Sequence, residues 1–85
     1  MQTKFKRHQP VKLLVDPDPE YVEFYGEEKP IRKGMSGKIN ILLPNGQYHV
    51  EIIDEKTGET IAYAKLDEES LEAIWFQSEN FFAIQ

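Results

Sequence analysis

An Asn-Gly turn between two alternating segments constrains this chain more than any other sequence feature. Apolar side chains recur at positions 39, 41 and 43 before the turn and at positions 48, 50 and 52 after it. This period of two is typical of strands with one buried face. Because Asn45 and Gly46 tolerate the positive φ of tight turns, the two segments predict a β-hairpin. A turn at 54–59 and a third strand at 60–66 extend the hairpin into a meander.

The residues before the meander predict a first strand and a long connection. Apolar side chains alternate within residues 5–15, which predicts a strand that has Pro10 at its edge or start and Val15 on its inner face. The two prolines of DPDPE, at 16–20, lack a backbone donor and therefore interrupt this strand. Residues 21–25 (YVEFY) form either a short strand or the rising arm of a long loop.

Glycines and apolar spacing predict the structure at the two ends of the meander. Gly34 and Gly37 indicate a tight turn or bulge in which only glycine fits comfortably. After Asp67, a good N-cap residue, apolar side chains recur at i, i+3 and i+4 from Leu71. This spacing predicts one or two helical turns over 68–76, and the alternative is a short 3₁₀ turn followed by a final strand.

Together these elements predict one mainly β domain. We assign residues 1–74 to a small antiparallel barrel of about five strands with one short helical turn, and residues 75–85 to an aromatic C-terminal tail. We assign Tyr63 to the inner face of its strand, and the alternative is that Ala62 and Ala64 form the inward pair. The predicted core consists of Val11, Leu13, Ile39, Ile41, Val50, Ile52, Ile61, Tyr63, Leu66 and Leu71.

Three motifs follow one another along the chain. They are Lys-x-Gly-x-x-Gly-x-Ile at 33–39, Tyr-x-Val-Glu at 48–51 and Leu-Glu at 71–72. In this order, over roughly residues 9–74, the chain resembles short bacterial proteins with an SH3-like barrel. It is also similar to SH3-like accessory subunits, which dock protein partners without chemistry, and to KOW barrels, which contact RNA or protein. The ALYDY sequence of signalling SH3 domains is absent, and the tail lies outside the pattern.

Composition narrows the classes of function. The net charge of −5 argues against bulk nucleic-acid binding, whose affinity comes mainly from neutralised phosphates. The absence of cysteine excludes disulfides and thiolate metal sites and favours a cytoplasmic location. No run of about 18 apolar residues is present to span a membrane. We therefore expect no cofactor and no membrane association.

Few residues suggest catalysis or metal binding. The carboxylates Asp16, Asp18 and Glu20 invite comparison with a calcium loop, but the prolines stiffen the segment and the required glycine is missing. His49 lies on the strand face opposite Tyr48, without a second histidine nearby in sequence, and Ser36 lacks a recognisable base partner. The sequence therefore predicts a protein that is not an enzyme.

Aromatic residues are the candidates for partner binding. The tail can add a strand to an open sheet edge, pack on a second copy or another protein, or fold back over the barrel as a lid. The predicted contacts to a protein partner are Trp75, Phe76, Phe81, Phe82, Tyr21 and Tyr25. The alternative is an RNA-contacting patch made by Lys29, Arg32, Lys33 and Lys38.

Overall fold

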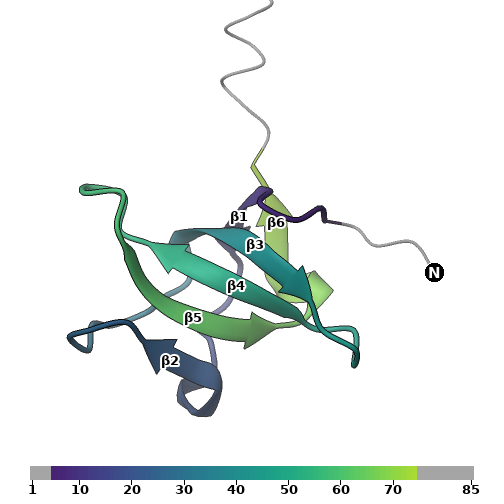
Figure 1. The fold of residues 1–85 in the computed structure, drawn as a ribbon, viewed down its shortest axis with the longest axis horizontal. Helices are drawn as coiled ribbons and strands as arrows, with labels where there is room; N and C mark the ends of the chain where they lie inside the picture. Colours follow the sequence, from purple (N-terminus) through teal and green to yellow (C-terminus); the bar gives the residue numbers. More distant parts are fainter. Residues whose placement is uncertain (1–4, 75–85) are drawn as a thin grey trace, which may run out of the picture.

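Residues 5–74, the part of the chain that the computed structural model describes, form a six-stranded antiparallel sheet (Figure 1). The mainly β class is therefore confirmed, and the helical structure of these residues is limited to two 3₁₀ turns. The strand order across the sheet is β2-β5-β4-β3-β1-β6. In chain order the elements are β1 (Pro10–Leu13), η1 (Pro19–Tyr21), β2 (Val22–Phe24), β3 (Ser36–Leu42), β4 (Tyr48–Ile53), β5 (Thr60–Leu66), η2 (Glu68–Ser70) and β6 (Leu71–Ala73).

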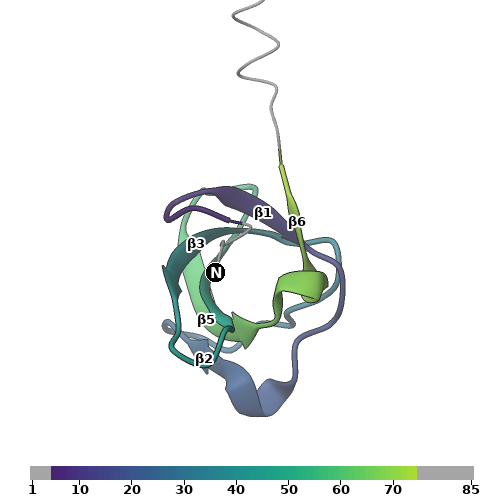
Figure 2. The same cartoon turned by 90° about the vertical axis from the view of Figure 1, so that its right-hand side faces the viewer.

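The sheet curls around its own apolar face. Figure 2 shows the strands arranged about a common interior, with β2 and β6 as the two ends of the curl. Within residues 5–74 these two edge strands do not pair with each other, so the sheet is not closed into a barrel. The prediction of about five strands is thus close to the six observed, whereas the closed barrel is not seen.

The predicted meander is confirmed as β3, β4 and β5. In the first turn Leu43 N–H donates to Gln47 O at 2.7 Å and Gly46 N–H donates to Leu43 O at 3.0 Å. Gly46 takes the positive φ of 92°, whereas Asn45 does not need one. The third strand, β5, has the bounds that the sequence predicts.

The core lies on the concave face of the sheet. Tyr48, Val50 and Ile52 of β4 are at most 2% exposed, as the alternation predicts. Ala62 and Ala64 are buried and Tyr63 is not, so the alternative assignment of β5 is the correct one. The buried apolar residues are Phe5, Val11, Leu13, Ile39, Tyr48, Val50, Ile52, Ile61, Ala62, Ala64, Leu66 and Leu71.

A β-bulge in β3 overturns the prediction that Ile41 belongs to the core. Ile39 pairs with Val50, but Ile41 pairs with His49, so Asn40 is an extra residue. An extra residue reverses the alternation of all later side chains in the strand. Ile41 therefore points outward and is 43% exposed.

A second irregularity, in β5, sets the orientation of Tyr63. Ile52 pairs with Ala62 while Ile53 pairs with Thr60, which makes Ile61 the extra residue. Ile61 and Ala62 are consequently both buried, and Tyr63 falls on the outer face.

The flanking strands are shorter than predicted. β1 begins at Pro10 and ends at Leu13, so Val15 lies beyond the strand and is 40% exposed instead of facing inward. Residues 21–25 do contain a short strand, β2. After Asp67 the alternative of a 3₁₀ turn followed by a final strand is correct, and within the described residues 68–74 the predicted helix is not formed, because β6 pairs with β1.

Gly37 occupies a position that no other residue fits, as the sequence predicts, but this position lies in the regularly paired part of β3 and not in a turn or bulge. A Cβ atom placed there would collide with the carbonyl oxygen of Glu51 and lie 3.1 Å from Cγ1 of Val50. Gly34 instead supplies a positive φ of 94° in the preceding turn, where its N–H donates to Leu13 O at 2.8 Å.

Two substitutions of the same kind test the bulge in β3. Ile52→Ala removes side-chain volume from a fully buried site and is expected to cost about 2–5 kcal/mol of unfolding free energy. Ile41→Ala, on the exposed side of the bulge, is expected to cost less than about 1 kcal/mol. Urea denaturation of both variants measures the difference, and equal losses would contradict the outward position of Ile41.

The close approach at Gly37 generates a second prediction. Gly37→Ala is expected to destabilise the fold by about 1–3 kcal/mol, because the β3–β4 pair must separate to admit the methyl group. Ser36→Ala, at the neighbouring partly exposed position, should change the unfolding free energy by at most about 1 kcal/mol. Thermal unfolding followed by circular dichroism compares the two, and a Gly37→Ala variant as stable as the wild type would refute the steric argument.

Candidate functional site

Two hydrogen bonds to aspartate side chains hold in place the long connection between β1 and β3, which contains η1 and β2. Asp18 caps η1, since its Oδ1 accepts from Glu20 N–H at 3.0 Å. Asp16 Oδ1 accepts from Lys33 N–H at 2.7 Å and so joins the beginning of the connection to its end. The two carboxylates thus organise the backbone, and among residues 5–74 no group of three or more His, Asp or Glu side chains is placed to hold a metal ion.

β2 attaches this connection to the outer strand of the meander. Glu23 pairs with Tyr63, and Tyr25 N–H donates to Ile61 O at 2.9 Å. Val22 and Phe24 pack against the core, which leaves the odd-numbered side chains on the outer face. Tyr21, at the end of η1, is 46% exposed and Tyr25 is 69% exposed.

Three aromatic rings and a histidine lie along β2, β4 and β5 on this outer face. His49 stacks on Tyr63 with ring centroids 5.1 Å apart and an interplanar angle of 10°. The Nδ1 atom of His49 lies 2.9 Å from Nδ2 of Asn40, which fixes the imidazole in its stacked orientation. Lys65 Nζ lies 5.6 Å from the centroid of the Tyr21 ring, within range of a cation–π contact.

Two open hollows flank Tyr63, and we call them together the tyrosine groove. The Tyr21 hollow has a volume of about 430 Å³ and is lined by Glu20, Tyr21, Glu23, His49, Tyr63 and Lys65, among others. The Tyr25 hollow has a volume of about 500 Å³ and is lined by Tyr25, Glu27, Lys29, Glu59, Ile61 and Tyr63, among others. An aromatic surface rimmed by charged side chains suits binding of another molecule better than chemical conversion of one.

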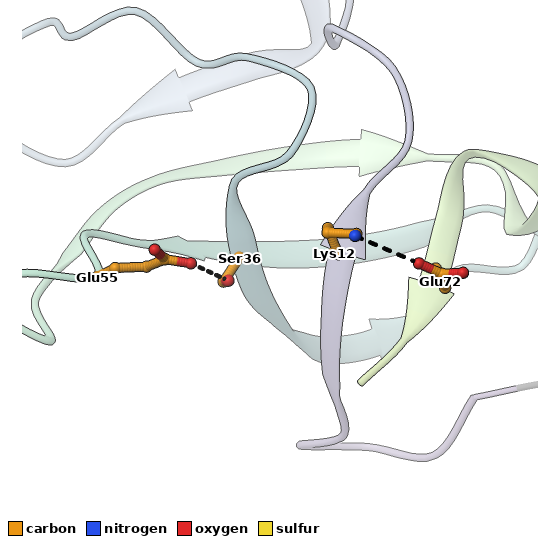
Figure 3. A network of polar contacts seen from close by, with 4 residues as sticks. All are labelled: Lys12, Ser36, Glu55 and Glu72. Atoms are coloured by element: carbon orange, nitrogen blue, oxygen red, sulfur yellow. Dashed lines mark hydrogen bonds and ion pairs between the residues drawn. The ribbon is translucent and has the colours of Figure 1, made fainter. Parts of the chain in front are cut away.

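Ser36, at the start of β3, takes part in a separate set of polar contacts near β1 and β6 (Figure 3). Its hydroxyl donates to Oε2 of Glu55 at 2.6 Å, while Lys12 Nζ pairs with Oε1 of Glu72 at 3.6 Å. The Glu55 carboxylate can accept the serine proton. The ion pair of Lys12 with Glu72, however, is half exposed and points away from Ser36 in Figure 3. The network is therefore typical of a solvated surface.

The register keeps Ser36 and His49 apart. Ser36 pairs with Ile53, and His49 pairs with Ile41. The two side chains are thus separated by four positions along β4, which is about 13 Å at the usual strand rise. The structure does not bring the candidate nucleophile and the candidate base together.

The basic residues of the RNA-binding alternative are dispersed among carboxylates. Lys29, Arg32 and Lys33 are all exposed in the segment before β3. Lys29 lines the Tyr25 hollow, together with two glutamates. Lys38 lies on the outer face of β3, opposite Glu51 in the register. The four positive charges do not form a continuous patch with one sign.

Of the residues predicted to contact a protein partner, Tyr21 and Tyr25 lie at the tyrosine groove. Trp75, Phe76, Phe81 and Phe82 lie outside the described residues. The sequence did not predict that Tyr63 and His49 join the groove. The available signal was the pair of small residues, Ala62 and Ala64, which flank Tyr63 and suit a crowded interior.

No protein-family model matches this chain, and no curated protein or solved structure shows significant similarity to it. Among the described residues there is also no helix with the length and apolar character needed to cross a membrane.

The Asp16 hydrogen bond generates a prediction about the groove. Asp16→Ala is expected to loosen the connection that carries Tyr21 and Tyr25, at a cost of about 1 kcal/mol, because the Lys33 amide loses its acceptor. Hydrogen exchange should then be faster at the Tyr25 amide, which bonds β5. Asp16→Asn keeps an acceptor oxygen and is the matched control. Unchanged hydrogen exchange at the Tyr25 amide in Asp16→Ala would show that the hydrogen bond between Asp16 and Lys33 does not position β2.

Proposed function

We propose that this protein is a non-catalytic protein-interaction module with an SH3-like fold, and that the tyrosine groove is its binding surface. The observation that carries the proposal is the exposure of Tyr21 and Tyr25 beside the His49–Tyr63 stack. Tyrosine supplies a large contact area with few rotatable bonds and is enriched at protein interfaces. Tyr21 and Tyr25 lie outside the core, so core packing does not explain why tyrosine occupies these two positions.

The strand order supports the SH3-like part of the proposal. A first strand, a long connection and a three-stranded meander follow one another in the order in which the chain resembles SH3-like proteins. Fold alone does not determine function, so the binding role rests on the groove.

The edge of the sheet beside the groove also favours a protein partner. Because Tyr25 and Glu23 direct their backbone groups toward β5, the N–H and C=O of Phe24 point away from the sheet. An extended segment of a partner can use such groups to continue a sheet. We propose that the aromatic tail, residues 75–85, supplies a second contact, either to the same partner protein or to another copy of this chain.

The RNA-binding alternative has less support. Its best observation is that Arg32 and Lys33 are both exposed next to each other. Phosphate binding depends on a continuous positive surface, however, and Lys29 and Lys38 each lie beside glutamates.

Affinity capture with three forms of the protein tests the proposed function. The Tyr21→Ala/Tyr25→Ala variant is expected to lose at least about 80% of each specifically captured partner, since exposed aromatic anchors carry much of the binding free energy. A Leu14→Ala/Leu42→Ala variant, which removes exposed apolar side chains elsewhere, should retain them. The third form ends at Ile74 and measures the contribution of the tail.

Light scattering on the same samples measures molar mass and so detects self-association, in which the partner is a second copy of the chain. Equal recovery of partners by the wild type and the tyrosine variant, with equal molar mass, would show that the groove is not the binding surface. Recovery of RNA instead of protein, lost at high salt, would favour the KOW-like alternative.

A further inference from the structure

One contact within the tyrosine groove is of the kind that a cationic ligand would make. Lys65 Nζ lies over the ring of Tyr21 at 5.6 Å from the centroid. The face of a tyrosine ring attracts cations because its π-electrons give it a negative potential. Tyr25 is more exposed, at 69%, and among the described residues it has neither a ring partner nor a cation over its face.

Unpaired carboxylates surround both rings. The Tyr21 hollow is lined by two carboxylates, Glu20 and Glu23, and by one cation, Lys65. The Tyr25 hollow is likewise lined by Glu27, Glu59 and Lys29. Each hollow therefore has two negative charges and one positive charge. Within residues 5–74 the ion pair of Lys12 with Glu72 is the only one between side chains, so none of these six groups is neutralised by a partner.

The spacing of the hollows matches an extended chain. Tyr21 and Tyr25 are four residues apart along η1 and β2, and the paired strand β5 runs from Ile61 to Lys65 over the same distance. Because only residues 22–24 between the two tyrosines are strand and Ile61 is a bulge, this separation is at most about 13 Å. Side chains at positions i and i+4 of an extended peptide lie on one face and span the same distance.

We propose that the tyrosine groove binds an extended segment of a partner protein through two basic side chains placed four positions apart. One Lys or Arg lies on Tyr25 between Glu27 and Glu59. The other takes the place of Lys65 on Tyr21. This inference rests on the proposed function and adds the chemical class of the segment that the module recognises.

The same charges exclude an anionic ligand from the groove. A phosphate or an acidic peptide placed there would meet four carboxylates at close range, whereas a basic segment gains attraction from them. Because the groove is open to solvent, this attraction should weaken as salt rises.

Selection of displayed random decapeptides on the full-length protein tests the inference without bias toward basic sequences. The expected result is enrichment of peptides with Arg or Lys at positions i and i+4. Enrichment of neutral or acidic peptides that depends on Tyr25 would overturn the basic-segment inference and leave the proposed function standing. No enrichment over the Tyr21→Ala/Tyr25→Ala variant would overturn both.

Paired variants then test the contacts with one fixed probe. The probe is a fluorescent decapeptide with Arg at positions 3 and 7 in a Gly, Ser and Thr background, and its control carries uncharged citrulline at both positions. Glu23→Gln is expected to weaken binding of the Arg peptide ~3-fold, since it removes one carboxylate from the groove. Lys65→Gln is expected to tighten binding ~3-fold, because it removes the lysine that competes for Tyr21.

Two further variants control for total charge. Glu72→Gln and Lys12→Gln make the same charge changes on β6 and β1, at the other end of the sheet, and should leave the dissociation constant within about 1.5-fold of the wild type. Equal binding of the citrulline and Arg peptides would overturn the inference. So would a Lys65→Gln variant that binds the Arg peptide no more tightly than Lys12→Gln does.

Discussion

The extra residue in β5 is the constraint on which the outer surface of this protein depends. Ile61 and Ala62 both face the core, and the strand then resumes its alternation with Tyr63 and Lys65 outward. Without that bulge the two alanines would face solvent, and the tyrosine would have to fit inside a small sheet. One residue of register thus separates a buried aromatic ring from an exposed one that stacks with His49.

The local parts of the fold follow from the sequence, and the errors occur where the strands depart from regular pairing. The Asn-Gly turn and the bounds of β5 depend on neighbouring residues, so they were predictable. The glycine at position 37 was singled out by its spacing from Gly34, although the atoms that require it belong to β4. Ile41 was misplaced because a bulge in β3 is decided by pairing with β4, which no local pattern reveals. The final strand was an alternative to a helix, since only pairing with β1 distinguishes them.

The candidate site was half predictable for the same reason. Tyr21 and Tyr25 stand out in a polar connection and were identified directly. Tyr63 and His49 come from strands that contribute to the core, and their outward direction depends on the register. The groove that results has rings that offer contact area and charges that offer selectivity, while Ser36, the candidate nucleophile, lies elsewhere on the sheet.

The pairing of β1 with β6 has a consequence for how the chain reaches this structure. Val11 pairs with Ala73, and Ile74 N–H donates to Pro10 O, so strands from opposite ends of the described chain share hydrogen bonds. During synthesis β1 can find β3 early, but its other edge stays open until residues 71–74 have left the ribosome. Because β6 follows β5 after the short turn η2, this last pairing closes only a short connection once β1 has joined the meander, so it should follow the meander without a long delay.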